Sequence, residues 1–310
     1  MSNVVWAGIA FVIYALAMIG IGVAFIKKSG SLSDYFLGGR KLNPWVAALS
    51  AQASDMSGWL LMGLPGAVYA FGTGQVWIAV GLAIGTMLNW VFVAKRLRRY
   101  TITAQDAITI PQYFEIRFRD ASHILRIASA VFIIVFFSVY TASGFVACAT
   151  LFSQVFGIGY QIALAIGVMV ILIYTFLGGF FAVCWTDLIQ GLLMLCALLA
   201  VPIIAAGALS GGGGGIAVNL QPGFLNFFTD ASGQPLTAVS LISQLAWGLG
   251  YFGMPHILVR FMAIKEEAGV KRATIIAGVW VFLCLGMAVL VGAVGAVFVP
   301  GLKDSETVFI

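Results

Sequence analysis

Charge, histidine and paired cysteine are all scarce in this sequence. Of its 310 residues only 9% are charged, and it has 2 histidines and 4 cysteines. The cysteines stand singly in apolar runs, and the sequence contains no CxxC pair, no HExxH motif and no clustered Cys and His ligands, which argues against disulfides and a zinc enzyme. The sequence also shows no combination of nucleophile, base and metal ligands, which argues against a membrane enzyme. Basic patches interleaved with aromatics are also lacking, which argues against a nucleic-acid partner.

Hydrophobic residues, in contrast, make up 62% of the chain, and the mean hydropathy is +1.06. This composition is typical of an integral membrane protein. Helices are the economical way to cross a bilayer, and the sequence lacks the short alternating strands of a membrane barrel. We therefore expect an all-α membrane protein whose apolar segments each cross about 30 Å of hydrocarbon. The predicted spans are 4–26, 45–67, 73–94, 127–152, 158–180, 187–209, 237–258 and 273–299.

The basic residues predict the orientation of these spans. Segments 27–41, 95–126 and 260–272 together hold all but one of the 16 lysines and arginines. Because basic loops stay on the cytoplasmic side, these segments are expected inside and the amino terminus outside, in a multi-pass protein of the cytoplasmic membrane. The net charge of +5 then reflects topology. The first apolar run has no leading basic region or cleavage pattern, so a removed signal peptide is not expected.

Three segments outside the spans have a character of their own. Residues 101–126 mix apolar and charged side chains, which predicts a short helix on the cytoplasmic face. Residues 211–215 are a run of glycines, which predicts a flexible linker. The sequence QPGF at 221–224 predicts a turn into an external loop.

Asp55 is the most informative residue, because it lies inside the otherwise uncharged span 45–67. An aspartate near the centre of a transmembrane helix costs about 2.5–3.5 kcal/mol, so it usually marks a functional site. Ser57 and Gly58 weaken the helix beside it and let a cation approach the backbone. This pattern predicts a discontinuous helix with an ion site. A role for Asp55 in helix packing or in proton binding is the alternative.

Span 237–258 carries a second interruption, in which glycines and a proline break any regular helix: Gly248, Gly250, Gly253 and Pro255. Two interrupted spans in matching positions are typical of transporters built from inverted repeats. We therefore expect a leading helix at 4–26, a first five-helix repeat at 45–209, and the first two helices of a second repeat at 237–299. Five spans separate the two repeat openings, an odd number, so the second repeat is inverted.

Four strings carry a resemblance to a known family: DYFLGGR at 34–40, LSAQASDMSGWLLMGLPGA at 49–67, WGLGYFG at 247–253 and PHIL at 255–258. With them the chain resembles the sodium:solute symporter family along nearly its whole length, and within it the members that carry proline. The resemblance implies one leading helix and the ten-helix inverted-repeat core of the leucine-transporter fold. Only seven core helices are present, so we expect an amino-terminal fragment, truncated after eight transmembrane helices.

The resemblance also implies roles for individual residues. Sodium is expected to bind backbone oxygens of Ala53 and Met56 and to need the carboxylate of Asp55, with the remaining ligands beyond the chain end. The residues expected around the substrate are Ser57, Gly58, Tyr140, Trp247, Tyr251 and Pro255. Arg40 and Asp187 are expected to influence coupling. One departure is Met254, where the family pattern has glutamine before the proline.

Together these expectations describe sodium-coupled uptake of L-proline by alternating access, with Na+ as coupling ion, lipid around the helices and no protein partner evident. Symport of pantothenate or another amino acid, proton coupling, and a symporter-like sensor module remain alternatives. Structural explanations also stay open for single residues. Trp247, Tyr251 and Tyr140 could be packing aromatics, and Asp187 an acidic residue at a helix N-terminus. Arg40 could be a topology charge and His256 a membrane-interface residue.

Overall fold

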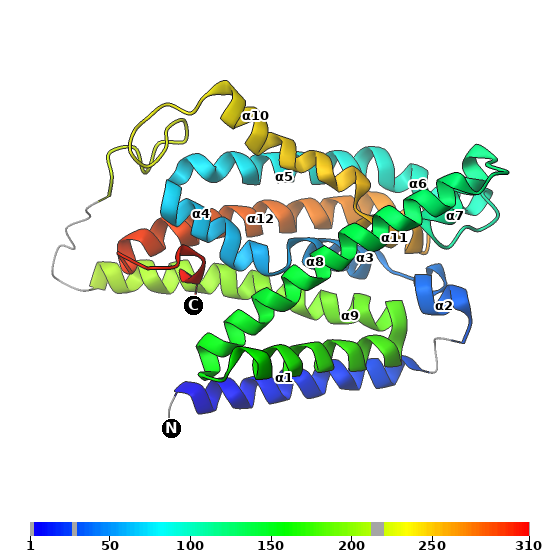
Figure 1. The fold of residues 1–310 in the computed structure, drawn as a ribbon, viewed down its shortest axis with the longest axis horizontal. Helices are drawn as coiled ribbons and strands as arrows, with labels where there is room; N and C mark the ends of the chain where they lie inside the picture. Colours follow the sequence, from blue (N-terminus) through cyan, green and yellow to red (C-terminus); the bar gives the residue numbers. More distant parts are fainter. Residues whose placement is uncertain (1–2, 27–29, 212–219, 310) are drawn as a thin grey trace. The chain divides into compact units, whose positions relative to one another are not determined.

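The computed structural model describes residues 3–26, 30–211 and 220–309, so Lys27, Lys28 and most of the glycine run at 211–215 lie outside the described residues. Within these ranges the chain is helical and forms no β-strand beyond isolated bridges (Figure 1). The α-helices are α1 (Asn3–Phe25), α2 (Leu32–Leu37), α3 (Pro44–Gly58), α4 (Leu64–Phe71), α5 (Val76–Leu88), α6 (Lys95–Thr103), α7 (Ile110–Phe118), α8 (Ile124–Phe156), α9 (Tyr160–Gly211), α10 (Ala238–Ala246), α11 (Pro255–Ala263) and α12 (Gly269–Phe298).

The helices account for all of the predicted spans. Among the described residues, 5 continuous helical runs are long and apolar enough to cross a membrane: Val4–Phe25, Thr73–Thr103, Ile124–Phe156, Tyr160–Leu209 and Gly269–Phe298. The run that starts at Tyr160 contains two predicted spans, so these runs cover all but 45–67 and 237–258. Those two segments form interrupted helices, as their sequences predict.

The long run α9 reverses direction at Gly179, where Figure 1 shows the ribbon folding back. Gly179 has φ 59° and ψ −160°, a conformation that residues with a side chain rarely adopt. A Cβ on Gly178 would lie 2.9 Å from the carbonyl oxygen of Gly22, and one on Gly179 would lie 2.9 Å from the ring of Tyr35. The glycine pair therefore separates the predicted spans 158–180 and 187–209, and residues 181–186 between them are helical.

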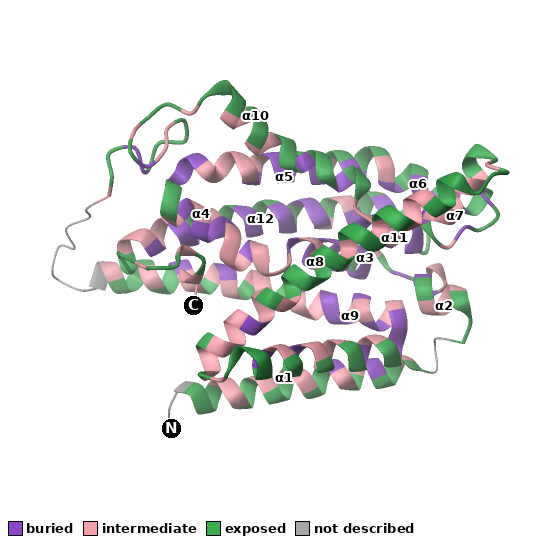
Figure 2. Ribbon diagram, in the orientation of Figure 1, coloured by how far each residue is buried: buried purple, intermediate pink, exposed green. Residues whose placement is uncertain are grey.

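The chain packs as two compact units, the first built from Met1–Ser54, Val93–Ile189 and Pro255–Ala273. In this unit α1 packs against α8 and α9. The ring of Phe11 lies 4.6 Å from that of Phe152, and the ring of Phe25 lies 5.1 Å from that of Phe181. Among the described residues of α8 only Ala149 is buried, and Figure 2 shows the rest of this helix exposed or half-buried. Its large apolar surface suits lipid or further protein.

The second unit contains Asp55–Phe92, Gln190–Met254 and Thr274–Ile310. Here α5 packs backbone to backbone against the 3-10 segment Trp247–Gly253. A Cβ on Gly85 would lie 2.1 Å from the carbonyl oxygen of Gly248, and one on Gly248 would lie 2.0 Å from that of Gly81. These distances leave no room for a side chain. The side chain of Asn89 secures the contact, because its Nδ2 donates to the carbonyl oxygen of Tyr251 at 2.8 Å.

The segments between the spans agree in part with what the sequence predicts for them. The turn at 221–224 is confirmed by a hydrogen bond of 3.0 Å from the amide of Phe224 to the carbonyl of Gln221. The short helix expected in 101–126 is α7, which begins after the N-cap residue Thr109, whose side chain accepts from the amide of Gln112.

Candidate ion and substrate site

The first interruption lies at Ser57 in α3. Its φ of 39° and ψ of −152° are far from helical values, and a π-helical turn, Trp59–Gly63, follows at once. Such backbone is costly for a residue with a side chain and is found mostly where function requires it. A break also leaves nearby backbone groups without regular helical partners. Ala53 and Met56, two of the candidate sodium ligands, are buried, whereas Asp55 is half-buried.

The second interruption separates α10 from α11. The segment Trp247–Gly253 forms a 3-10 helix, and Met254 is extended with φ −78° and ψ 104°. Tyr251 is buried, whereas Trp247 is exposed and its ring lies 5.1 Å from that of Trp59. The second compact unit thus brings Trp247 to the residue that follows Gly58. Trp59 was not predicted as a site residue, although its position inside the family motif could have indicated it.

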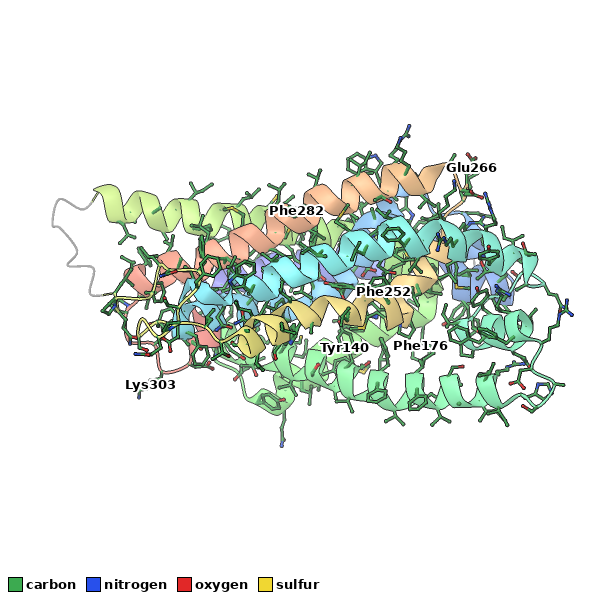
Figure 3. The ribbon with its side chains drawn as sticks, turned by 90° about the horizontal axis from the view of Figure 1, so that it is seen from above. Tyr140, Phe176, Phe252, Glu266, Phe282 and Lys303 are labelled. Carbon is green, nitrogen blue, oxygen red and sulfur yellow. The ribbon has the colours of Figure 1, made fainter. Side chains whose placement is uncertain are left out.

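In the first compact unit Tyr140 contacts the part of α3 that precedes the break. Tyr140, labelled in Figure 3, lies near the middle of α8, and its hydroxyl donates to the carbonyl oxygen of Ser54 at 3.1 Å. Its ring also stacks on that of His256, with the centroids 5.6 Å apart. His256 follows Pro255, so Tyr140 contacts the residue next to another candidate substrate residue. The ring of His256 also contacts that of Phe137, with the centroids 5.3 Å apart, and its position relative to a membrane stays a prediction.

The structure excludes one of the two interpretations of Asp187. The alternative to a role in coupling was an acidic residue at a helix start, where it would suit the helix dipole, but the helix resumes just after Gly179 and Asp187 lies about two turns further on. Its carboxylate instead accepts hydrogen bonds from Ser50 at 2.7 Å and from Arg260 at 2.8 Å. Both charged side chains are buried. A buried charge is normally paired, and this pairing explains an aspartate inside an apolar helix. The role of Asp187 in coupling stays a prediction.

Arg260 was missed, because it was counted with the basic loop 260–272. It lies inside α11 with 4% of its surface exposed. An arginine between Val259 and Phe261 carries the same signal as Asp55, a charge in an apolar helix, and that signal could have identified it.

Arg40 is more than a topology charge. It has a positive φ of 54°, and its guanidinium donates to Asp106 at 2.8 Å, to the carbonyl of Ala107 at 2.9 Å and to the carbonyl of Met262 at 2.7 Å. It therefore ties the turn before α3 to the end of α11. This arrangement suits the expected influence on coupling, which stays a prediction.

Oxygen atoms are the ligands that this site can offer to a cation. Within the described ranges, no group of three or more His, Cys, Asp or Glu side chains could hold a metal ion. Sodium prefers oxygen ligands, and in transporters of this kind unwound backbone carbonyls supply them. The buried backbone before Ser57 and the half-buried carboxylate of Asp55 fit that donor set.

Comparison with known proteins agrees with this geometry. The model of the sodium:solute symporter family matches residues 35–308. The chain belongs to this family. The chain is 46% identical to the sodium/proline symporter of Escherichia coli K12, over 97% of the chain and 61% of that protein. It is 45% identical to the osmoregulated proline transporter OpuE of Bacillus subtilis 168, and 44% identical to a sodium/proline symporter of Staphylococcus aureus.

The fold is shared with a solved structure of another protein. A structure titled as the substrate-bound, outward-open state of a Na+-coupled sialic acid symporter aligns with a TM-score of 0.77 at 21% identity, covering 96% of this chain and 64% of that one. The expected all-α, leucine-transporter-like fold is thereby confirmed. This chain spans 61% of the length of its E. coli relative. The roles of individual site residues and the boundaries of the two repeats stay predictions.

Proposed function

We propose that the full-length protein containing this chain carries out sodium-coupled uptake of L-proline by alternating access, as a secondary transporter and not as an enzyme. The observation that carries this proposal is the interruption of α3 at Ser57, inside the segment 45–67 that the sequence predicts to be a membrane span. Interrupted helices supply ion and substrate sites in transporters of this fold. Identities of 44–46% to proline symporters support the choice of substrate.

Sodium is the coupling ion in this proposal. The carbonyl oxygens of Ala53 and Met56 would bind it from the interrupted helix, and Asp55 would supply the negative charge that favours a cation there. No cluster of metal-binding side chains is needed for this role, because backbone oxygens satisfy a hard cation. Sodium binding would raise proline affinity, and by linkage proline would raise sodium affinity equally.

The substrate would lie beside the same interruptions. Backbone at Ser57 and Gly58 would approach the substrate closely, and Trp247 and Tyr251 would pack on the apolar ring of proline or present a π face to its secondary ammonium. Tyr140 and Pro255 complete the proposed lining. The hydrogen bond from the hydroxyl of Tyr140 to Ser54, three residues before Ser57 in the chain, supports this role.

The charged side chains of Asp187 and Arg40 would influence the coupling of sodium and substrate transport. Asp187 pairs with Arg260 on α11, and Arg40 donates to the end of the same helix. Both therefore act on the helix that carries Pro255. The amino terminus is proposed to lie outside the cytoplasmic membrane, with lipid around the helices, on the basis of the basic segments. No protein partner is required.

A second candidate is the same mechanism with another small organic solute, such as pantothenate or another amino acid. The structural relative named for sialic acid favours it, since it shows this fold with a chemically different substrate. A sensor module with a symporter-like membrane domain is the candidate from another class, and it would require substrate binding without sodium-driven accumulation.

Labelled proline uptake tests the proposal. The full-length protein, wild type or Asp55→Ala, is expressed in cells that lack their own proline carriers and is assayed in sodium and in choline medium. Glu266→Gln serves as a control, because its side chain is 71% exposed. We expect sodium-dependent uptake in the wild type and control, and its loss in Asp55→Ala. Uptake absent in both media would reject proline as substrate, and uptake indifferent to sodium would reject the ion site.

A further inference from the structure

The C-terminal end of α11 is held by hydrogen bonds from two other segments of the chain. The last carbonyls of a helix have no partners inside the helix and carry a partial negative charge. Here the last two residues of α11 and the two residues that follow it, 262–265, each accept a hydrogen bond at their carbonyl from another segment. The donors belong to Arg40, Leu42 and Arg98, which lie in the turn before α3 and in α6.

Arg98 supplies two of these hydrogen bonds. Its Nε donates to the carbonyl of Ile264, and its Nη2 donates to the carbonyl of Lys265 at 3.0 Å. Two donors in one rigid plane can bind two successive carbonyls, which a lysine ammonium cannot match. Leu42 adds a backbone pair, because its amide donates to Ala263 at 3.1 Å and its carbonyl accepts from Lys265 at 2.9 Å.

The burial of Arg98 indicates that stability alone does not explain it. Only 6% of its surface is exposed, and its Nη1 has no hydrogen-bond partner among the described residues. Burying a charge with an unsatisfied donor costs free energy. The neighbouring Arg99 behaves differently, since its side chain is 61% exposed and pairs with Glu267 at 2.7 Å.

Helix α11 connects residues 262–265 to the candidate site. α11 has 9 residues, so about 13 Å separates its ends. At its start lie Pro255 and His256, and His256 stacks on Tyr140. In its middle Arg260 pairs with Asp187. A short helix fixed at its end and middle moves as one body, so a change at residues 262–265 would shift Pro255 and His256.

We propose that Arg98 is a positioning residue for transport: it holds the two residues that directly follow α11 against α6, and transport requires that these hydrogen bonds be broken and remade in each cycle. The inference rests on the proposed function and on the proposed cytoplasmic position of these segments. No contact of Arg98 with ion or substrate is involved. Weakening the hold should therefore favour conformations in which α11 is reached from the cytoplasm.

The test compares Arg98→Gln and Arg98→Lys with Arg99→Gln, all in the full-length protein carrying Val259→Cys, a half-buried position on α11. The readout is the rate at which an impermeant thiol reagent labels position 259 in inside-out vesicles without substrate, against the same protein lacking that cysteine. We expect Arg98→Gln to raise the rate on the order of tenfold, Arg98→Lys to raise it less, and Arg99→Gln to leave it near the parent rate.

Kinetics of proline uptake separate positioning from folding. We expect Arg98→Gln to change kcat by a larger factor than KM, with partial rescue by Arg98→Lys. Unchanged labelling and unchanged kinetics in Arg98→Gln would overturn the proposal. If Arg98→Gln fails to reach the membrane, wild-type labelling and kinetics in Arg98→Lys would overturn it equally. A wild type without sodium-dependent proline uptake would reject the proposed function, while the labelling comparison would still decide the role of Arg98.

Discussion

Asp187 and Arg260 form a buried ion pair, with Asp187 Oδ2 2.8 Å from Arg260 Nη2. Ser50 joins the pair, because its hydroxyl donates to the same carboxylate oxygen at 2.7 Å and accepts from Arg260 Nε at 2.6 Å. The three residues come from α9, α11 and α3. One carboxylate thus connects the first interrupted helix to the helix that follows the second interruption, within a single compact unit.

Removing one charge of this pair should destabilise the protein strongly. Asp187→Asn leaves Arg260 buried without a counter-charge, which costs roughly 3–5 kcal/mol in comparable buried pairs. The expected result is a lower amount of protein in the membrane and a lower unfolding temperature in detergent. Asp34→Asn is a matched control, since its partner Lys41 is 68% exposed and surface pairs contribute about 0–1 kcal/mol.

A double substitution separates the stability of the pair from its role in transport. Asp187→Leu with Arg260→Met replaces both charges by apolar side chains, a change that is often neutral for stability. We expect membrane levels near those of the wild type and proline uptake that stays impaired. Restored uptake in the double variant would show that the pair serves folding alone.

The close approach of α5 and the segment Trp247–Gly253 gives a second prediction. A Cβ on Gly248 would lie 2.0 Å from the carbonyl oxygen of Gly81, so Gly248→Ala must push the two backbones apart. The expected cost is at least about 1–3 kcal/mol, visible as reduced thermal stability. Gly253→Ala lies in the same segment with no atom within 4 Å of its Cβ, and we expect near wild-type stability there. Equal stability of both variants would contradict the packing described.

The hydroxyl of Tyr140 gives a third prediction. Tyr140→Phe removes the 3.1 Å hydrogen bond to the carbonyl of Ser54 but keeps the ring that stacks on His256. A lost hydrogen bond of this kind corresponds to about 0.5–1.5 kcal/mol, so KM for proline should rise several-fold with little change in protein level. Tyr100→Phe, at an exposed ring on α6, is the control. An unchanged KM would remove Tyr140 from the proposed site.

The sequence predicts local features of this fold better than it predicts which distant residues contact each other. The apolar spans follow from composition over about 20 residues. Both interruptions follow from small residues at 53–58 and 248–255, and the second segment also contains Pro255. The reversal at Gly179 could also have been anticipated from two adjacent glycines. What local patterns cannot supply is the partner of a charge. Asp187 and Arg260 are 73 residues apart, so each was assigned a role from its own surroundings.

The same limit applies to the contacts of Arg98 and Arg40, which the sequence does not reveal. Both lie in segments whose basic residues predict topology, and a count of charges treats every arginine alike. The structure distinguishes them, because Arg98 is buried while Arg96 and Arg99 are exposed. A helix end that accepts hydrogen bonds from remote arginines leaves no local mark in the sequence.

The contact between α7 and α8 should depend on pH through Glu115. Its carboxylate hydrogen-bonds to His123 and pairs with Arg126 at 3.1 Å, and the bond to His123, followed by the charge of Arg126, lowers the pKa of Glu115. A carboxyl whose folded pKa is lowered stabilises the fold above its unfolded value of about 4.3. That contribution is lost as the pH falls through the lowered pKa.

Hydrogen exchange of the amides of α7, corrected for the intrinsic rate, measures this effect. In the wild type, protection should be constant above about pH 5 and fall in acid, because protonation weakens the bonds from Glu115. Glu115→Gln should show weaker protection at neutral pH and a smaller change in acid. Glu266→Gln, whose side chain is 71% exposed, should follow the wild type. The same acid dependence in Glu115→Gln as in the wild type would mean that another group controls this contact, since the amide cannot ionise.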